Sequence, residues 1–163
     1  MNRRHALAAL AAAPLVFGAL AHAQAAEPTK AQPSLPTEML TIVTHDGKEH
    51  VFHVEMAVSP EQQITGLMFR TSVAPDGGML FDWGSARESQ MWMKNTLVPL
   101  DMVFINPDGR IRHIAENTVP ESLAVIDSGG PVQATLELAA GTTERLDIRV
   151  GDLVKARLFH NAG

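Results

Sequence analysis

The 163-residue chain contains no cysteine. This absence excludes a cysteine-linked lipid anchor, a thiolate metal site and a cysteine nucleophile. It does not exclude an oxidising compartment. A folded part of about 125 residues buries roughly two-thirds of the surface of its unfolded chain and needs no disulfide.

An excess of basic residues is also missing. From residue 27 onward the chain carries 11 Lys and Arg residues against 18 Asp and Glu residues, a net charge of −7. Nucleic acids and anionic membrane surfaces are bound through clustered Lys and Arg, so neither is an expected partner. The sequence has no internal repeat, no Gly-x-Ser-x-Gly elbow and no phosphate-binding loop, so neither a serine hydrolase nor a P-loop enzyme is indicated.

The one long apolar run lies at the N-terminus. Arg3 and Arg4 precede apolar residues 6–20, and Ala21-His22-Ala23 fits a small-x-small cleavage site. The run is short for a membrane span, although an uncleaved anchor is the alternative. We expect residues 1–26 to be a cleaved signal peptide of an exported protein, periplasmic or extracellular, with no stable membrane span left. The paired arginines leave open a route for already folded proteins.

Residues 27–37 are rich in proline and are expected to form a flexible tether. The folded β domain is expected over residues 38–160. Its first two apolar segments, 39–44 and 49–56, flank Asp46-Gly47, which predicts a hairpin. A two-residue turn at that point places Val43, Phe52 and Val54 on one face.

A short helix is predicted after this hairpin. Ser59 can cap it, Pro60 suits its first position, Gln62 completes a capping box, and Gly66 is a stop. Three apolar residues are expected to hold the helix on the core: Ile64, Leu67 and Met68.

The rest of the chain alternates short apolar segments with turn residues. Val132, Ala134, Leu136 and Leu138 are expected to face inward, with Gln133, Thr135 and Glu137 outward. A strand at 123–126 is expected to end at Ser128-Gly129-Gly130-Pro131. Further strands are predicted at 79–81, 90–94, 102–105, 110–115 and 153–159.

About eight short strands at this spacing predict a mostly-β single domain. We expect a β-sandwich or jelly-roll-like, partly closed barrel, with one short N-terminal helix and a short helical turn near Thr142.

Several ordered blocks of this sequence resemble one known family. They are Gly66-Leu67-Met68-Phe69-Arg70, Gly78-Met79-Leu80-Phe81, residues 91–96, residues 99–105 and residues 136–141. Together they resemble the family called domain of unknown function 192, over about residues 39–159. The resemblance implies a compact β-sandwich that bacteria often make with a signal peptide, and it implies no activity.

Residues 91–94 carry the most unusual chemistry. On a strand, Met91 and Met93 face one way, and Trp92 and Lys94 face the other. An exposed indole is a stacking platform for sugars and other flat ligands, and its ring can hold a cation. The other polar residues expected to line a cleft beside it are Arg70, Asn95, Thr96, Asp101 and Glu137.

The leading prediction is therefore a non-enzymatic binding or accessory domain without a cofactor. Its expected partner is a small molecule, with a carbohydrate favoured, or a component of the cell envelope. An alternative is a hydrolase or lyase acting on a carbohydrate or cell-wall fragment through Asp101 and Glu137. In the plainer interpretation, Asp101 caps a turn or pairs with Lys94 or Arg70.

A second alternative is Cu(I) handling through the thioethers of Met91 and Met93. Methionine more commonly fills gaps in a core, so no metal site is predicted. The histidines do not form a ligand set either. His50 and His53 lie three residues apart and face opposite sides of a strand.

Overall fold

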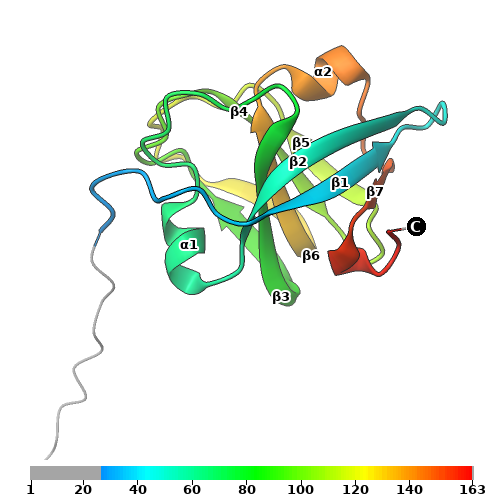
Figure 1. Ribbon diagram of the computed structural model, residues 1–163, viewed down its shortest axis with the longest axis horizontal. Coiled ribbons are helices and arrows are strands. Elements are labelled where there is room, and N and C mark those ends of the chain that lie inside the picture. The colour runs from blue at the N-terminus through cyan, green and yellow to red at the C-terminus, as the bar shows by residue number, and fades with distance from the viewer. Residues whose placement is uncertain (1–26, 163) are drawn as a thin grey trace, which may run out of the picture.

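The computed structural model describes residues 27–162, and the expected signal peptide, residues 1–26, lies outside the described residues. Seven strands form one sheet in the order β5-β4-β6-β3-β2-β1-β7 (Figure 1). The strands are β1 (Thr37–Val43), β2 (Glu49–Ala57), β3 (Gly77–Met91), β4 (Leu100–Ile105), β5 (Ile111–Ala115), β6 (Ile126–Ala139) and β7 (Leu153–Lys155).

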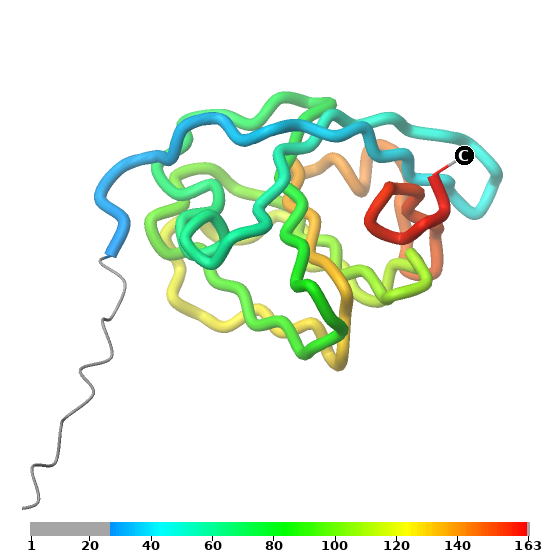
Figure 2. The backbone as a smooth tube through the Cα atoms, turned by 60° about the horizontal axis from the view of Figure 1, so that its bottom comes forward, coloured from blue at the N-terminus to red at the C-terminus, as the bar shows by residue number. Residues whose placement is uncertain are grey.

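The sheet curls until its two edges meet at one end. Arg110, next to β5, forms a bridge with Leu153 of β7. The Ile111 amide donates to the carbonyl of Asp152 at 2.9 Å. In Figure 2 the C-terminal segment, in red, lies beside the N-terminal strand β1 with which it pairs. The predicted mostly-β, partly closed barrel is confirmed, built from a single curled sheet.

Each face of the sheet carries an apolar cluster. The inner cluster receives side chains from all seven strands and includes Leu40, Phe52, Val103, Leu136 and Val154. The outer cluster lies on the opposite face, under α1 and the loops that follow β3. Its members are Ala57, Leu67, Met79, Phe81, Met93, Leu100, Met102, Phe104 and Val132.

The first hairpin differs from the sequence prediction by one residue. The Thr44 amide donates to the Lys48 carbonyl, and Gly47 takes a φ of 82°, so the loop has three residues instead of two. A shift of one residue turns every side chain to the other face. Leu40 and Ile42 therefore join Phe52 and Val54 in the inner cluster, and the placement of Val43 there was wrong.

Two predicted strand breaks are absent. β3 unites the segments predicted as separate strands at 79–81 and 90–94, although it ends at Met91. β6 runs through Ser128-Gly129-Gly130-Pro131, so the strand predicted at 123–126 was wrong. Register shifts in the β3–β6 pairing absorb the irregular residues, and glycine with positive φ is typical of such bulges. The last strand is also shorter than predicted, because a 3₁₀ helix, η1 (Arg157–Phe159), replaces its end.

The predicted helix is confirmed as α1 (Pro60–Thr65). The Ser59 hydroxyl accepts from the Gln62 amide, the Gln62 side chain accepts from the Ser59 amide, and Gly66 ends the helix. Leu67 and Met68 are buried as predicted, but Ile64 is 46% exposed, so its expected place in the core was wrong.

The helical turn predicted near Thr142 is α2 (Thr142–Leu146).

Part of the expected tether contacts the domain. The Gln32 side-chain amide donates to the carbonyls of Gln62 and Gly66 at the end of α1, and the Leu35 amide donates to the Glu55 carboxylate. These bonds hold residues 32–35 beside α1. Within residues 27–162, no helix has the length and apolarity needed to cross a bilayer.

Candidate functional site

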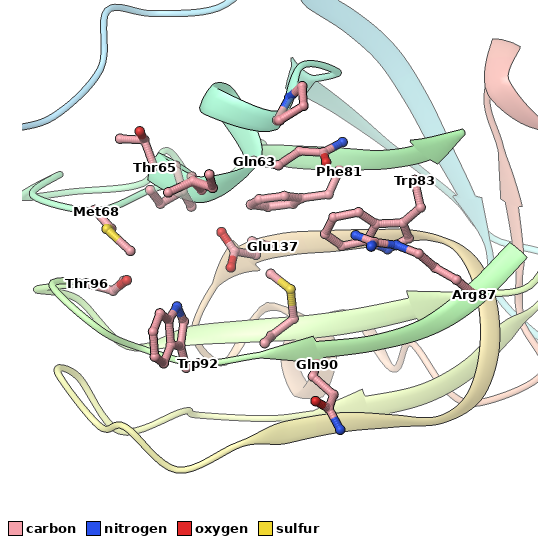
Figure 3. Close-up of a pocket in the computed structure, with 15 residues that line it drawn as sticks. Gln63, Thr65, Met68, Phe81, Trp83, Arg87, Gln90, Trp92, Thr96 and Glu137 are labelled. Atoms are coloured by element: carbon pink, nitrogen blue, oxygen red, sulfur yellow. The ribbon is translucent and has the colours of Figure 1, made fainter. Parts of the chain in front are cut away.

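A pocket of about 510 Å³ opens between α1 and the C-terminal half of β3 (Figure 3). The residues after α1, the end of β3 and the segment after β3 form its walls, and Glu137 of β6 lies at its floor. The lining residues are Pro60, Gln63, Ile64, Thr65, Gly66, Leu67, Met68, Phe81, Trp83, Arg87, Gln90, Met91, Trp92, Thr96 and Glu137.

The central position of β6 places Glu137 at the floor. Glu137 is opposite Met79 of β3 on one side and Met102 of β4 on the other, and both methionines are fully buried. Its side chain points away from the inner cluster, as the alternation of apolar and polar residues in the sequence predicts. The prediction did not anticipate that this face is covered, so Glu137 and Thr135 are buried instead of facing solvent.

The Glu137 carboxyl has no hydrogen-bond partner among residues 27–162. Only 4% of the residue is exposed, and its Oε2 atom is buried and unpaired. Burial raises the pKa of Glu137 to about 8, because an apolar environment disfavours the charged form. Figure 3 shows this carboxyl pointing into the space between Met68, Phe81 and Trp92. The pocket therefore ends on a carboxyl group that is mostly neutral at pH 7 and free to bind.

Trp92 forms part of the rim. It is 47% exposed, and the Lys94 ammonium lies 5.1 Å from the centre of its ring and pairs with Glu27 at 2.6 Å. β3 ends at Met91, so residues 92–94 are not the predicted strand. The predicted sidedness nevertheless holds for Trp92, which is exposed, and for Met93, which is fully buried.

Trp83 and Arg87 form the other end of the pocket. The Arg87 guanidinium lies 4.3 Å from the centre of the Trp83 ring, which is tilted against Phe81 with 5.6 Å between the ring centres. The Trp83 indole N–H donates to Thr135 at 3.2 Å. These contacts hold the rings of Trp83 and Phe81 in place.

Three residues with positive φ meet beside the pocket: Phe69 (61°), Asn95 (55°) and Glu121 (60°). Hydrogen bonds hold all three in place, since the Phe69 amide donates to the Asn95 carbonyl and the Glu121 amide donates to the Thr96 carbonyl. Left-handed backbone at a non-glycine residue costs free energy and clusters at functional sites. The strained junction positions Met68 and Thr96, which line the pocket.

Asp101 lies outside the pocket. Asp101 pairs in register with Leu138 of the inner cluster, so its side chain and that of Glu137 leave the sheet on opposite faces. Its carboxylate accepts from the amides of Asn117, Gly141 and Thr143 and from the Thr143 hydroxyl, at 2.9–3.2 Å. Asp101 thus joins β4 to the start of α2, close to the turn-capping role considered from sequence.

The other predicted site residues fall into two groups, those that line the pocket and those that do not. Trp92, Thr96, Glu137 and Met91 line the pocket, whereas Arg70, Lys94 and Asn95 do not. Arg70 pairs with Glu55 at 3.0 Å, and the Asn95 side chain contacts the Met68 sulfur at 3.8 Å. Met93 lies in the outer cluster and accepts a hydrogen bond from Thr118 at 3.1 Å. In the part of the chain that the structure describes, no three His, Cys, Asp or Glu residues are grouped to hold a metal.

Sequence reasoning missed several lining residues: Gln63, Thr65, Trp83, Arg87 and Gln90. No spacing in the sequence connects them. α1 reaches β3 because β2 pairs with β3 in parallel, with Ala57 opposite Phe81, so the chain between the two strands crosses the outer face. The only local indication was the helix start at Ser59-Pro60.

Comparison with known proteins gives a family match and two solved relatives. The family model for domain of unknown function 192, described as "Uncharacterized ACR", matches residues 41–156. A crystal structure from Sinorhizobium meliloti, described as that of a candidate transcription regulator, is 49% identical, with a TM-score of 0.76, and the match covers 78% of this chain and 99% of that one. A protein of unknown function from Novosphingobium aromaticivorans is 37% identical, with a TM-score of 0.73 and coverage of 81% and 94%. No functionally curated protein matches the chain significantly.

Proposed function

Because the chain belongs to the domain of unknown function 192 family, which is uncharacterised, we propose its function from the pocket: it is an exported binding domain that holds a small organic molecule over Glu137. The ligand is a small molecule, with a carbohydrate favoured, either free or as part of a cell-envelope component. The proposal includes no nucleic-acid partner, because the chain from residue 27 onward has a net charge of −7.

The unpartnered carboxyl of Glu137 carries this proposal. A buried polar group without a hydrogen bond destabilises a fold by about 1–3 kcal/mol, so such groups are rare unless they serve a function. Here the group ends a pocket of about 510 Å³, a size typical of small-molecule sites. A bound ligand supplies the hydrogen bonds that the Glu137 carboxyl does not receive from the described residues.

The aromatic rim supports a ligand with a flat or apolar face. Trp92 is 47% exposed at one end of the pocket, and Phe81 and Trp83 line the other. Sugars present such a face together with hydroxyl groups. A neutral carboxyl can donate one hydrogen bond and accept another, which matches a hydroxyl pair.

A thermal-shift screen of sugars and small polar organic molecules tests the proposal. A ligand present at 100 times its dissociation constant stabilises the fold by about 2.7 kcal/mol. Trp92→Ala and Glu137→Leu are expected to remove most of this gain, because leucine can neither donate nor accept a hydrogen bond. Met39→Ala, at a position 66% exposed on β1, is the matched control and is expected to keep it. A gain that survives both pocket substitutions would place the ligand elsewhere and refute the proposed site.

A second candidate function follows from the raised pKa of Glu137, about 8, which is the property of a general acid. Glu137 alone would protonate the leaving group of a carbohydrate or cell-wall fragment, because Asp101 lies on the other face of the sheet. Release of products from such fragments is expected to fall by about 10²-fold or more in Glu137→Gln. An activity that Glu137→Gln leaves intact excludes this mechanism.

Export is the remaining part of the proposal. It is supported by the paired arginines, the apolar run and the Ala-rich cleavage region within residues 1–26. Intact-mass measurement of the protein recovered outside the cytoplasm is expected to show an N-terminus between residues 24 and 27. A full-length N-terminus would show instead that the segment is retained.

A further inference from the structure

The polar side chains nearest α1 have no hydrogen-bond donor left for a ligand. Both amide hydrogens of Gln63 are used, one on the Ala57 carbonyl at 3.1 Å and one on the Asp82 carbonyl at 2.6 Å. The Thr65 hydroxyl donates to the Glu61 carbonyl at 3.0 Å. What these side chains still offer to the pocket is oxygen lone pairs.

The same holds on the opposite wall. The Thr96 hydroxyl donates to the Lys94 carbonyl at 3.3 Å, so only its acceptor lone pairs remain. Gln90, which is exposed at the rim, uses one amide hydrogen on Asp127 at 3.3 Å. Apart from Gln90, two side chains in the lining keep free donors among the described residues. They are Arg87, whose guanidinium lies against Trp83, and Trp92 at the rim, whose indole N–H is not used.

The apolar part of the wall is electron-rich. Phe81 and Trp92 present aromatic rings, whose faces attract cations, and Met68 and Met91 contribute thioether sulfurs, which are weak acceptors. Arg87 is the only cation in the lining, and no cation contacts Glu137 among the described residues. The pocket therefore lacks a positive charge where its carboxyl lies.

We propose that the pocket binds a primary ammonium group, carried on an apolar or cyclic stem, and that this ammonium pairs with the Glu137 carboxylate. An ammonium group has three donors and no acceptor, which complements the Glu137 carboxyl, the π faces and the acceptor oxygens on both walls. The inference rests on the proposed function and specifies the ligand of that same pocket. A simple alkylamine and an amino sugar share this chemistry.

Binding must release a proton. In the empty pocket Glu137 is mostly neutral, because burial raises its pKa to about 8. When the ammonium enters, the carboxyl loses its proton to solvent, and the two charged groups form N–H···O hydrogen bonds. Affinity for the amine is therefore expected to rise about tenfold from pH 6 to pH 7 and to level off above about pH 8.

No other group in the pocket titrates in this range. Gln63 and Thr65 beside α1, Met102 of β4 and Thr96 carry no ionisable group. Arg87 of β3 is the only other ionisable side chain that the described residues contribute to the lining, and arginine is not deprotonated in proteins. A pH-dependent affinity can therefore be assigned to Glu137.

Isothermal titration calorimetry of the mature protein with two matched pairs tests the inference: cyclohexylamine against cyclohexanol, and glucosamine against glucose. Each amine is expected to bind at least tenfold more tightly than its alcohol. Glu137→Gln is expected to abolish the preference, and cyclohexylamine is expected to show the tenfold rise from pH 6 to pH 7 in the wild-type protein. The second readout needs no variant.

The outcomes separate this inference from the proposed function. If the alcohols bind as well as the amines and the binding depends on Trp92, the ammonium assignment is wrong and the binding pocket stands. The same holds if only a neutral ligand from the screen binds. If no compound of either kind binds in a way that depends on Trp92 or Glu137, both are wrong.

Discussion

Two buried carboxyls on neighbouring strands have opposite surroundings. Asp101 on β4 is fully buried and accepts four hydrogen bonds from the polypeptide, two of them from Thr143. Glu137 on β6 is 4% exposed and accepts none from the part of the chain that the structure describes. The first carboxyl has all the partners it needs to fix α2 against the sheet. The second has no such partner among the described residues, which is why the pocket, and not Asp101, is the candidate site.

The difference comes from which face of the sheet each side chain takes. Asp101 points toward the end of the barrel where α2 begins, and amides at a helix start favour a negative charge there. Glu137 points into the outer cluster between two methionines, where α1 and the residues after β3 leave a space. A buried carboxyl group therefore stabilises the fold at Asp101 and destabilises it at Glu137.

The largest expected effect is the loss of the Asp101 carboxylate. Asp101→Ala leaves the three backbone amides of Asn117, Gly141 and Thr143 without this acceptor and is expected to lower the free energy of unfolding by about 3–5 kcal/mol. Glu137→Gln, the matched control, breaks no hydrogen bond and is expected to change it by less than about 1 kcal/mol at pH 6. Urea unfolding at pH 6 measures both. Equal losses would remove the distinction between the two carboxyls.

The pH dependence of stability should show the cost of Glu137. The folded state keeps a proton to about pH 8 that the unfolded chain releases near pH 4.5. Stability is therefore expected to fall as pH rises between these values, by about 1.4 kcal/mol per pH unit from this group, and to lose nothing further from it above about pH 8. Comparing wild type with Glu137→Gln in urea unfolding at several pH values isolates this slope. Parallel curves would show that Glu137 ionises freely in the fold.

A finer test concerns one donor to Asp101. The Thr143 hydroxyl donates to Asp101 at 2.9 Å and lies 2.9 Å from Glu116, so Thr143→Val is expected to cost about 1–2 kcal/mol. Thr142→Val is the neighbouring control, because among residues 27–162 the Thr142 side chain has a single hydrogen bond, accepted from Arg145 at 3.5 Å. If the two variants lose the same stability, the hydroxyl bond to Asp101 contributes nothing of its own.

The smallest expected effect on stability is that of Trp92→Ala. Trp92 is 47% exposed, so the substitution is expected to change the free energy of unfolding by less than about 1 kcal/mol while it removes ligand binding. Thermal melts with and without ligand separate the two quantities. A loss of several kcal/mol without ligand would show that Trp92 belongs to the core rather than to the rim.

Local features of the fold could be predicted from sequence, and features set by distant contacts could not. The capping box at Ser59 and Gln62 is complete within four residues, and the structure reproduces it. The continuity of β6 through Gly129-Gly130 depends on its pairing with β3, which hides the break that the glycines suggest locally. Closure at Arg110 and Leu153 joins residues more than forty positions apart.

The candidate site shows the same limit. Trp92 and Thr96 could be predicted because they lie together in one unusual segment, and Glu137 because it is a carboxylate on the polar side of an alternating strand. That Glu137 and Asp101 point to opposite faces depends on the pairing of β4 with β6, which no local pattern reveals. The donors already used by Gln63 and Thr65 became visible only with the contacts of α1.

The measurement that tests the central claim most directly is the titration of the Glu137 carboxyl itself. In a protein labelled with ¹³C at glutamate side chains, the carboxyl resonance absent from Glu137→Gln identifies this residue. Its midpoint is expected near pH 8, and saturation with a tightly binding amine is expected to keep the group ionised well below that pH. A midpoint near pH 4.5 would contradict the account, because a carboxyl that ionises so readily is neither isolated from water nor in need of a ligand.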